Sequence, residues 1–246
     1  MAATAATEAP VLDHDAWMAI ATEEYRRLSD LLRSLDEAEW SLPTDCPGWD
    51  VRAMVAHLCG AAEGNARLRE SLRQAAVGVR RFRRPVLVDS INEVQIAERA
   101  DRTPAQLVAE LDDSGRRGVA ARSRLPRVVR SVVVPFGPPL GTKSVGYLMD
   151  RIYTRDAWMH RIDIARATGR ELVPTADHDG LLVRDVVVEW AAAHGRRFDL
   201  ELTGPAGLRL SRGTGGPSLS LDAVEYARLM AGRGRGEGLL ATTVPF

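Results

Sequence analysis

The chain has 246 residues, 45% of them hydrophobic and 27% charged, an ordinary composition for a globular protein of one large or two small domains. Its 33 basic and 33 acidic residues cancel, so the net charge gives no reason to expect nucleic acid as a partner. Two cysteines, Cys46 and Cys59, are too few for a secreted disulfide framework. No apolar run approaches the roughly 20 residues that span a bilayer, so we expect a cytoplasmic protein without a membrane partner.

Apolar residues recur every three or four positions along several segments, a spacing that predicts amphipathic helices. The first of these helices would span residues 13–35. Asp50 stands as the N-cap of a second helix, which would run from Val51 to about Ala76, ahead of an arginine-rich connector at 78–85. Further helices are expected over 90–100, from Pro104 to before Pro126, from the Ser144 cap to Thr168, over 177–193 and over 222–231.

Beyond Gly195 the hydrophobic period changes from three or four residues to two. Residues 198–204 and 207–213 alternate in this way across a turn, which predicts a β-hairpin, and 219–221 would add a short strand. We therefore expect a mainly α protein in which a helical bundle precedes a small α/β domain. The expected organisation is a disordered tail over 1–10, the bundle over 11–173 and the α/β domain over 174–246.

Asp156 and His160 lie four residues apart, on the face of their predicted helix that also carries Ile152 and Met159. A buried carboxylate is unfavourable unless it is paired or bound to a metal, and no arginine at helical spacing on the same helix can neutralise Asp156. His57, beside the apolar stripe of the second helix, would approach the same interior. Two histidines and one carboxylate match catalytic zinc or non-haem iron sites. The competing interpretation is a structural ion pair.

Two further residues and one arginine-rich run could each be structural or functional. Asp163, three residues beyond His160, is either a surface or capping charge or a side chain that hydrogen-bonds a ligating histidine. Cys59 does not share a helical face with His57, so we expect it to be structural and buried rather than catalytic. The arginine-rich run 80–84 is interpreted as a solvated connector rather than a nucleic-acid site.

Two segments carry a recognisable pattern: WSLPTDCPGWDVRAMVAHL at 40–58 and TRDAWMHRIDIARATGR at 154–170. This pattern resembles the maleylpyruvate isomerase family of mycothiol-dependent enzymes, within the DinB-like superfamily of four-helix-bundle metalloproteins. The resemblance implies that His57, Asp156 and His160 bind a divalent metal, usually taken as zinc. Relatives of the isomerase itself usually carry glutamate at the position of Asp156, and the shorter aspartate raises the prospect of weaker metal binding or of none.

The resemblance extends to the C-terminal segment, which looks like the small α/β domain of the same family, distantly similar to sterol-carrier-like folds. It implies mycothiol as a cofactor. Arg233 matches a position that the family uses near its active site, where a guanidinium suits a substrate carboxylate; the alternative is a solvated arginine. Lys143 is the only lysine among the 33 basic residues, a bias that fits a GC-rich actinobacterial source.

These features together predict a mycothiol-using, divalent-metal-dependent enzyme that acts on a small electrophilic substrate. It would be either a thiol S-transferase or a thiol-assisted cis/trans isomerase, because a metal favours the thiolate form of a bound thiol. The expected partners are the small-molecule substrate and the low-molecular-weight thiol, and the chain would be a monomer or a homodimer. The alternative is a non-catalytic DinB-like protein with a degenerate metal site that binds a small ligand or has a regulatory role.

Overall fold

The computed structural model describes residues 12–138 and 140–246, and the expected tail at 1–10 lies outside these described residues. The chain divides into two compact units. One is His14–Leu172, and the other is Val173–Phe246 together with the described residues before His14. Among the described residues, no helix is both long and apolar enough to cross a membrane.

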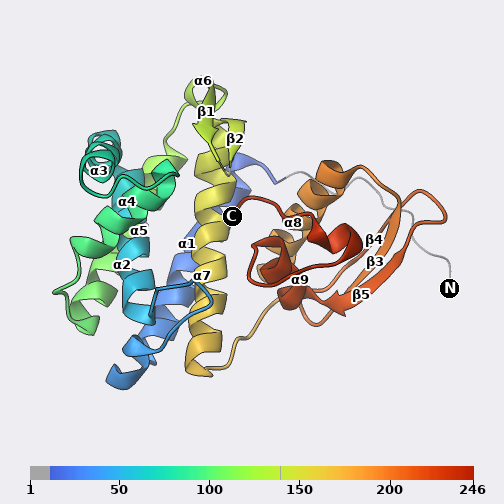
Figure 1. Ribbon diagram of the computed structural model, residues 1–246, viewed down its shortest axis with the longest axis horizontal. Coiled ribbons are helices and arrows are strands. Elements are labelled where there is room, and N and C mark those ends of the chain that lie inside the picture. The colour runs from blue at the N-terminus through green and yellow to red at the C-terminus, as the bar shows by residue number, and fades with distance from the viewer. Residues whose placement is uncertain (1–11, 139) are drawn as a thin grey trace. The chain divides into compact units, whose positions relative to one another are not determined.

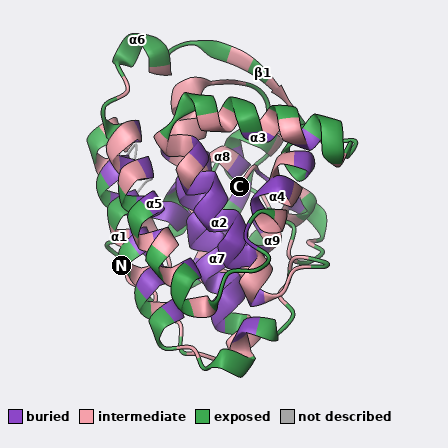
Figure 2. Cartoon of the chain, turned by 90° about the vertical axis from the view of Figure 1, so that its left-hand side faces the viewer, coloured by how far each residue is buried: buried purple, intermediate pink, exposed green. Residues whose placement is uncertain are grey.

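Four long helices form the core of the first unit (Figure 1). Both α5 and α7 pack against α1 and α2, so the four helices close into a bundle around one interior. Burial is most continuous along α2 and α7, as Figure 2 shows. The bundle helices are α1 (His14–Arg33), α2 (Val51–Ala66), α5 (Pro104–Ser123) and α7 (Tyr153–Thr168).

Local signals set the ends of these helices as the sequence predicted. The Thr103 side chain accepts a hydrogen bond from the Gln106 backbone N–H, and Pro104 follows it in the first turn of α5. At the end of α7, Gly169 adopts a left-handed conformation with φ of 66° and terminates the helix. These predicted helix limits are confirmed.

The length predicted for the second helix is wrong. Helix α2 ends at Ala66, Arg67 is extended with φ of −148°, and a separate helix, α3 (Leu68–Arg81), follows. The predicted connector at 78–85 is therefore helical in its first half. Apolar periodicity does not reveal this break, because the residues on both sides of Arg67 are good helix formers. The next helix is α4 (Leu87–Ala97), and both α3 and α4 pack on α2.

A short hairpin leads into α7. Strands β1 (Val133–Gly137) and β2 (Gly141–Ser144) pair antiparallel. The Ser144 hydroxyl accepts the N–H of Tyr147, as expected of a cap. A wide π-helical turn, η2 (Tyr147–Ile152), then continues into α7. The remaining short elements of this unit are η1 (Glu37–Ser41) and α6 (Arg127–Arg130).

The second unit is a small α/β fold. Its three-stranded sheet has the order β4-β3-β5; β3 and β4 pair antiparallel and confirm the predicted hairpin, whereas the parallel pairing of β5 with β3 was not predicted. Trp190 lies in the core of this unit, and its ring centroid is 4.9 Å from that of Phe198 and 5.8 Å from that of Tyr226. The elements are α8 (Asp179–His194), β3 (Phe198–Thr203), β4 (Arg209–Arg212), β5 (Ser218–Asp222), α9 (Ala223–Met230) and η3 (Gly238–Ala241).

A buried ion pair joins α1 to α7 inside the bundle. Arg161 donates from Nε to Glu24 Oε1 at 2.6 Å and from Nη2 to Oε2 at 3.1 Å. The two side chains are 5% and 0% exposed, so neither charge is solvated by bulk water. Because Arg161 follows His160 directly, this pair fixes the rotation of α7 about its axis and thereby the direction of the histidine.

We predict that Arg161→Met lowers the free energy of unfolding by about 3–5 kcal/mol, because it deprives the buried Glu24 carboxylate of its bidentate partner. Urea denaturation followed by circular dichroism measures the loss. The double variant Glu24→Leu/Arg161→Met should recover most of it, whereas Arg116→Met, at an exposed arginine, should have little effect. Equal stability of Arg161→Met and the wild-type protein would contradict the role of the pair.

Candidate metal centre

The structure brings three predicted site residues together across the bundle. His57 comes from α2, and Asp156 and His160 come from consecutive turns of α7. One ligand atom from each lies within 4.8 Å of the other two. The Nε2 atoms of both histidines lie 3.3 Å from the Asp156 carboxylate, His57 facing Oδ2 and His160 facing Oδ1. The Asp156 side chain is 23% exposed and the histidines 7% and 6%, so the aspartate is the most accessible member.

These distances fit a metal ion. Ligand atoms about 2.0–2.1 Å from a tetrahedral ion lie about 3.3 Å apart, the separation found here between each imidazole nitrogen and its carboxylate oxygen. Two neutral nitrogens and one carboxylate are also the donor set of catalytic zinc sites, which leave one position for water or substrate. The residues of this chain therefore suit a divalent cation, and their role as ligands stays a prediction.

The three side chains are electrostatically coupled. Burial favours the neutral form of the Asp156 carboxyl, but the charges and hydrogen bonds of His160 and His57 outweigh this effect and lower its pKa. Burial likewise opposes charge on His160, yet the adjacent Asp156 carboxylate raises the pKa of this histidine well above its usual value. The carboxylate thus attracts positive charge, which either a proton or a metal cation can supply, and the two compete.

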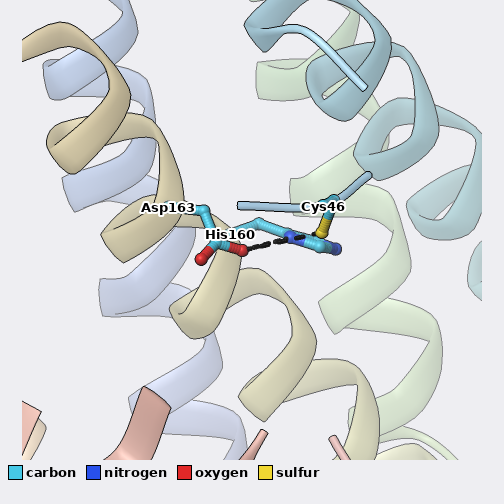
Figure 3. A group of neighbouring side chains, drawn as sticks. All are labelled: Cys46, His160 and Asp163. Atoms are coloured by element: carbon cyan, nitrogen blue, oxygen red, sulfur yellow. Dashed lines mark hydrogen bonds and ion pairs between the residues drawn. The ribbon is translucent and has the colours of Figure 1, made fainter. Parts of the chain in front are cut away.

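The second nitrogen of His160 faces another carboxylate. Its Nδ1 lies 3.2 Å from Asp163 Oδ2, and the Asp163 side chain is fully buried. The thiol of Cys46, from the segment before α2, donates to the same carboxylate oxygen at 3.9 Å, as Figure 3 shows. The surface or capping interpretation of Asp163 is wrong, and its geometry is that of a group orienting a ligating histidine through Nδ1.

Three residues beside the site were missed by sequence reasoning. The Trp49 ring lies 5.0 Å from His57 and 5.9 Å from His160, between centroids. Cys46 and Trp49 belong to the turn that the first motif contains, and their presence within that motif was the available signal. Gln95 of α4 places Oε1 2.7 Å from His57 Nδ1. Gln95 lies outside both motifs, and a single polar residue on a helix does not indicate a contact with a distant histidine.

Two other named residues have clear surroundings. Cys59 is fully buried, donates weakly to the Leu107 carbonyl at 3.5 Å and has a pKa raised by burial, as expected of a structural cysteine. Arg233 belongs to the second unit and follows α9. Its Nη1 donates to the Ala231 carbonyl at 3.3 Å. Its contact with a substrate carboxylate stays a prediction.

The first unit is thus a four-helix bundle with a candidate metal centre, and the second is a small α/β domain, which is the predicted fold class. The model of the family described as the mycothiol maleylpyruvate isomerase N-terminal domain matches residues 21–165, more than half of the chain. The chain therefore belongs to this family of enzymes.

Two solved structures share the fold: the mycothiol-dependent maleylpyruvate isomerase and a point mutant of it. Each is 20% identical to this chain, with a TM-score of 0.60, and the similarity covers 91% of this chain and 90% of the solved one. A search of curated proteins finds no match. At this identity the structures establish the common fold across both units, whereas substrate and site chemistry require their own tests.

We predict that Asp163→Asn weakens zinc binding by about 10–100-fold, because the loss of the carboxylate reduces the basicity and orientation of His160. Competition with a chromophoric chelator measures the dissociation constant. Asp113→Asn, at an exposed aspartate of α5, serves as the control and should bind zinc like the wild-type protein. An unaltered dissociation constant in Asp163→Asn would show that this carboxylate does not support the site.

Proposed function

We propose that this chain is a divalent-metal-dependent enzyme that uses mycothiol and acts on a small electrophilic substrate. The observation that carries the proposal is the convergence of two imidazole Nε2 atoms on one carboxylate, each at 3.3 Å, within a member of this enzyme family. We further propose zinc as the ion, because nitrogen and carboxylate ligands suit it, and the cytoplasm as the compartment, because thiols stay reduced there.

His57, Asp156 and His160 would hold the ion, with Asp163 and Gln95 orienting the imidazoles from their Nδ1 sides. When bound, the cation would favour the thiolate form of a small thiol and so supply a nucleophile at neutral pH. Cys59 is unsuited to that task, because it is buried and its pKa is raised. The ring of Trp49 lies beside both histidines and forms an apolar part of the surroundings of the site.

The reaction class follows from the chemistry of a thiolate. The thiolate sulfur can add to the β-carbon of an electron-poor double bond in the substrate, which leaves a single bond that can rotate. When the thiolate leaves again with its electron pair, the double bond re-forms in the other geometry, and no thiol is consumed. If the sulfur stays attached and the carbanion takes up a proton from solvent, the outcome is S-transfer. We propose this pair of outcomes for the chain, with isomerisation favoured by the family to which it belongs.

The non-catalytic alternative depended on the shorter side chain of Asp156. In the structure this aspartate reaches both His57 and His160 with separate carboxylate oxygens. The missing methylene therefore does not prevent the three side chains from converging, and membership in an enzyme family favours the catalytic interpretation.

We predict that freshly purified, untagged protein contains about one equivalent of divalent metal, and that His57→Ala and His160→Ala lose it because each removes one of three ligands. Elemental analysis for zinc, nickel, iron and manganese measures the content. His194→Ala, a histidine of the second unit, is the matched control and should retain the metal. Full stoichiometry in either ligand variant would exclude the proposed site.

In an assay with mycothiol and maleylpyruvate, we expect isomerisation that depends on both the thiol and the metal. Chelation should abolish the rate, and added zinc should restore it, because the nucleophile requires the cation. Mass spectrometry of the products separates isomerisation from S-transfer, since only the latter leaves a thiol conjugate. Full activity after complete metal removal would contradict the metal-dependent proposal.

A further inference from the structure

A chain of buried amide hydrogen bonds starts at the Nδ1 side of His57. His57 Nδ1 lies 2.7 Å from Gln95 Oε1, Gln95 Nε2 donates to Gln74 Oε1 at 2.9 Å, and Gln74 Nε2 donates to the Gly60 carbonyl at 3.0 Å. The two glutamines are only 4% and 1% exposed. We call Gln95, Gln74 and the Gly60 carbonyl the amide relay; it connects α4 and α3 to two turns of α2.

The relay has only one consistent direction. A backbone carbonyl can only accept, so Gln74 must present its NH₂ group to Gly60, and its Oε1 is left to face Gln95. Gln95 must then donate through its NH₂ group and present Oε1 to His57. The carboxylate of Glu70 also accepts from Gln74 Nε2, at 3.1 Å, and reinforces the same orientation. The ring nitrogen that faces Gln95 Oε1 therefore has to carry a hydrogen.

A neutral imidazole with its hydrogen on Nδ1 has its lone pair on Nε2. In His57 this lone pair faces Asp156 Oδ2, another acceptor, at 3.3 Å. Two acceptors in that position repel one another unless a proton or a metal cation lies between them. We propose that the amide relay fixes the tautomer of His57 and directs its Nε2 lone pair at the metal, which makes Gln95 and Gln74 positioning residues. This inference rests on the proposed function.

The close packing of α2 and α4 allows Gln95 to reach His57. A Cβ atom at Gly60 would lie 2.5 Å from Gln95 Cγ and 2.6 Å from its Cβ, so only glycine allows Gln95 to approach α2 closely enough. Arg99 holds the same region in place. Its Nη1 donates to the Gln95 carbonyl at 3.2 Å, and its Nη2 pairs with Glu63 of α2 at 2.9 Å.

The two histidines are therefore supported by different chemistry. The Nδ1 of His160 faces the carboxylate of Asp163, whereas that of His57 faces a neutral amide. A neutral acceptor also specifies the tautomer but adds no charge near the ion. The chain has three glutamines, and two of them belong to the relay; the third, Gln106, is exposed at the start of α5.

The test compares Gln95→Leu, which removes the acceptor, with Gln95→Glu, which keeps it. We expect zinc affinity to fall by about 10–100-fold in Gln95→Leu and to be restored to within a few-fold of wild type in Gln95→Glu. Gln106→Leu makes the same chemical change at an exposed position and should bind zinc normally. Two-bond ¹H–¹⁵N spectra of the histidine rings report the tautomer directly. They should show His57 protonated at Nδ1 and bound to zinc through Nε2 in the wild-type protein.

Protonation of His57 at Nε2 in the zinc-loaded wild-type protein would overturn the proposal, as would zinc affinity in Gln95→Leu equal to that of the wild type. If Gln95→Leu does not fold, the wild-type spectrum and Gln95→Glu still decide the question. Failure of the wild-type protein to bind zinc would contradict the proposed function instead. In that case the ring spectrum of the metal-free protein, recorded at a pH at which the His57 ring is neutral, tests the relay separately, since Nδ1 protonation of neutral His57 follows from the amide direction alone.

Discussion

The carboxylate of Asp156 lies between two imidazole rings in the bundle, and a negative charge there requires positive charge beside it. Much of the surrounding structure meets that requirement. Helix α2 supplies one ring and α7 the other, and the Glu24–Arg161 pair fixes how α7 is turned toward α1. The same requirement makes the site suited to a cation, since a divalent ion would satisfy the carboxylate and both nitrogen lone pairs at once.

The groups that contact the Nδ1 atoms of the two histidines distinguish this bundle from one that only buries charged residues. Asp163 on one side and the amide relay on the other each contact an Nδ1 atom, and both leave the corresponding Nε2 directed at Asp156. Helices α3 and α4 lie outside the four-helix core, yet Gln74 and Gln95 give them a role at the site. An imidazole held through its Nδ1 atom would lose little freedom if an ion bound at Nε2, as in a preorganised centre.

The sequence predicted the bundle and the convergence of His57, Asp156 and His160, because helical periodicity determines which residues share a buried face. It did not predict the break at Arg67, where the apolar pattern continues through a change of direction. Cys46 and Trp49 approach the site from a turn that has no period, and Gln95 reaches it through contacts between distant helices. Asp163 was identified, but its burial depends on Cys46 and the turn packed against α7, which lie far away in the chain.

The π-helical turn at Tyr147–Ile152 lies between the β1–β2 hairpin and the helix that carries Asp156 and His160. Such a turn contains one residue more than an α-helical turn, and turns of this kind are frequent near functional sites. The extra residue changes the direction about the helix axis at which the hairpin joins α7, relative to the direction in which Asp156 and His160 point. The β1–β2 hairpin is therefore offset by one residue from the helical register that directs Asp156 and His160 toward α2.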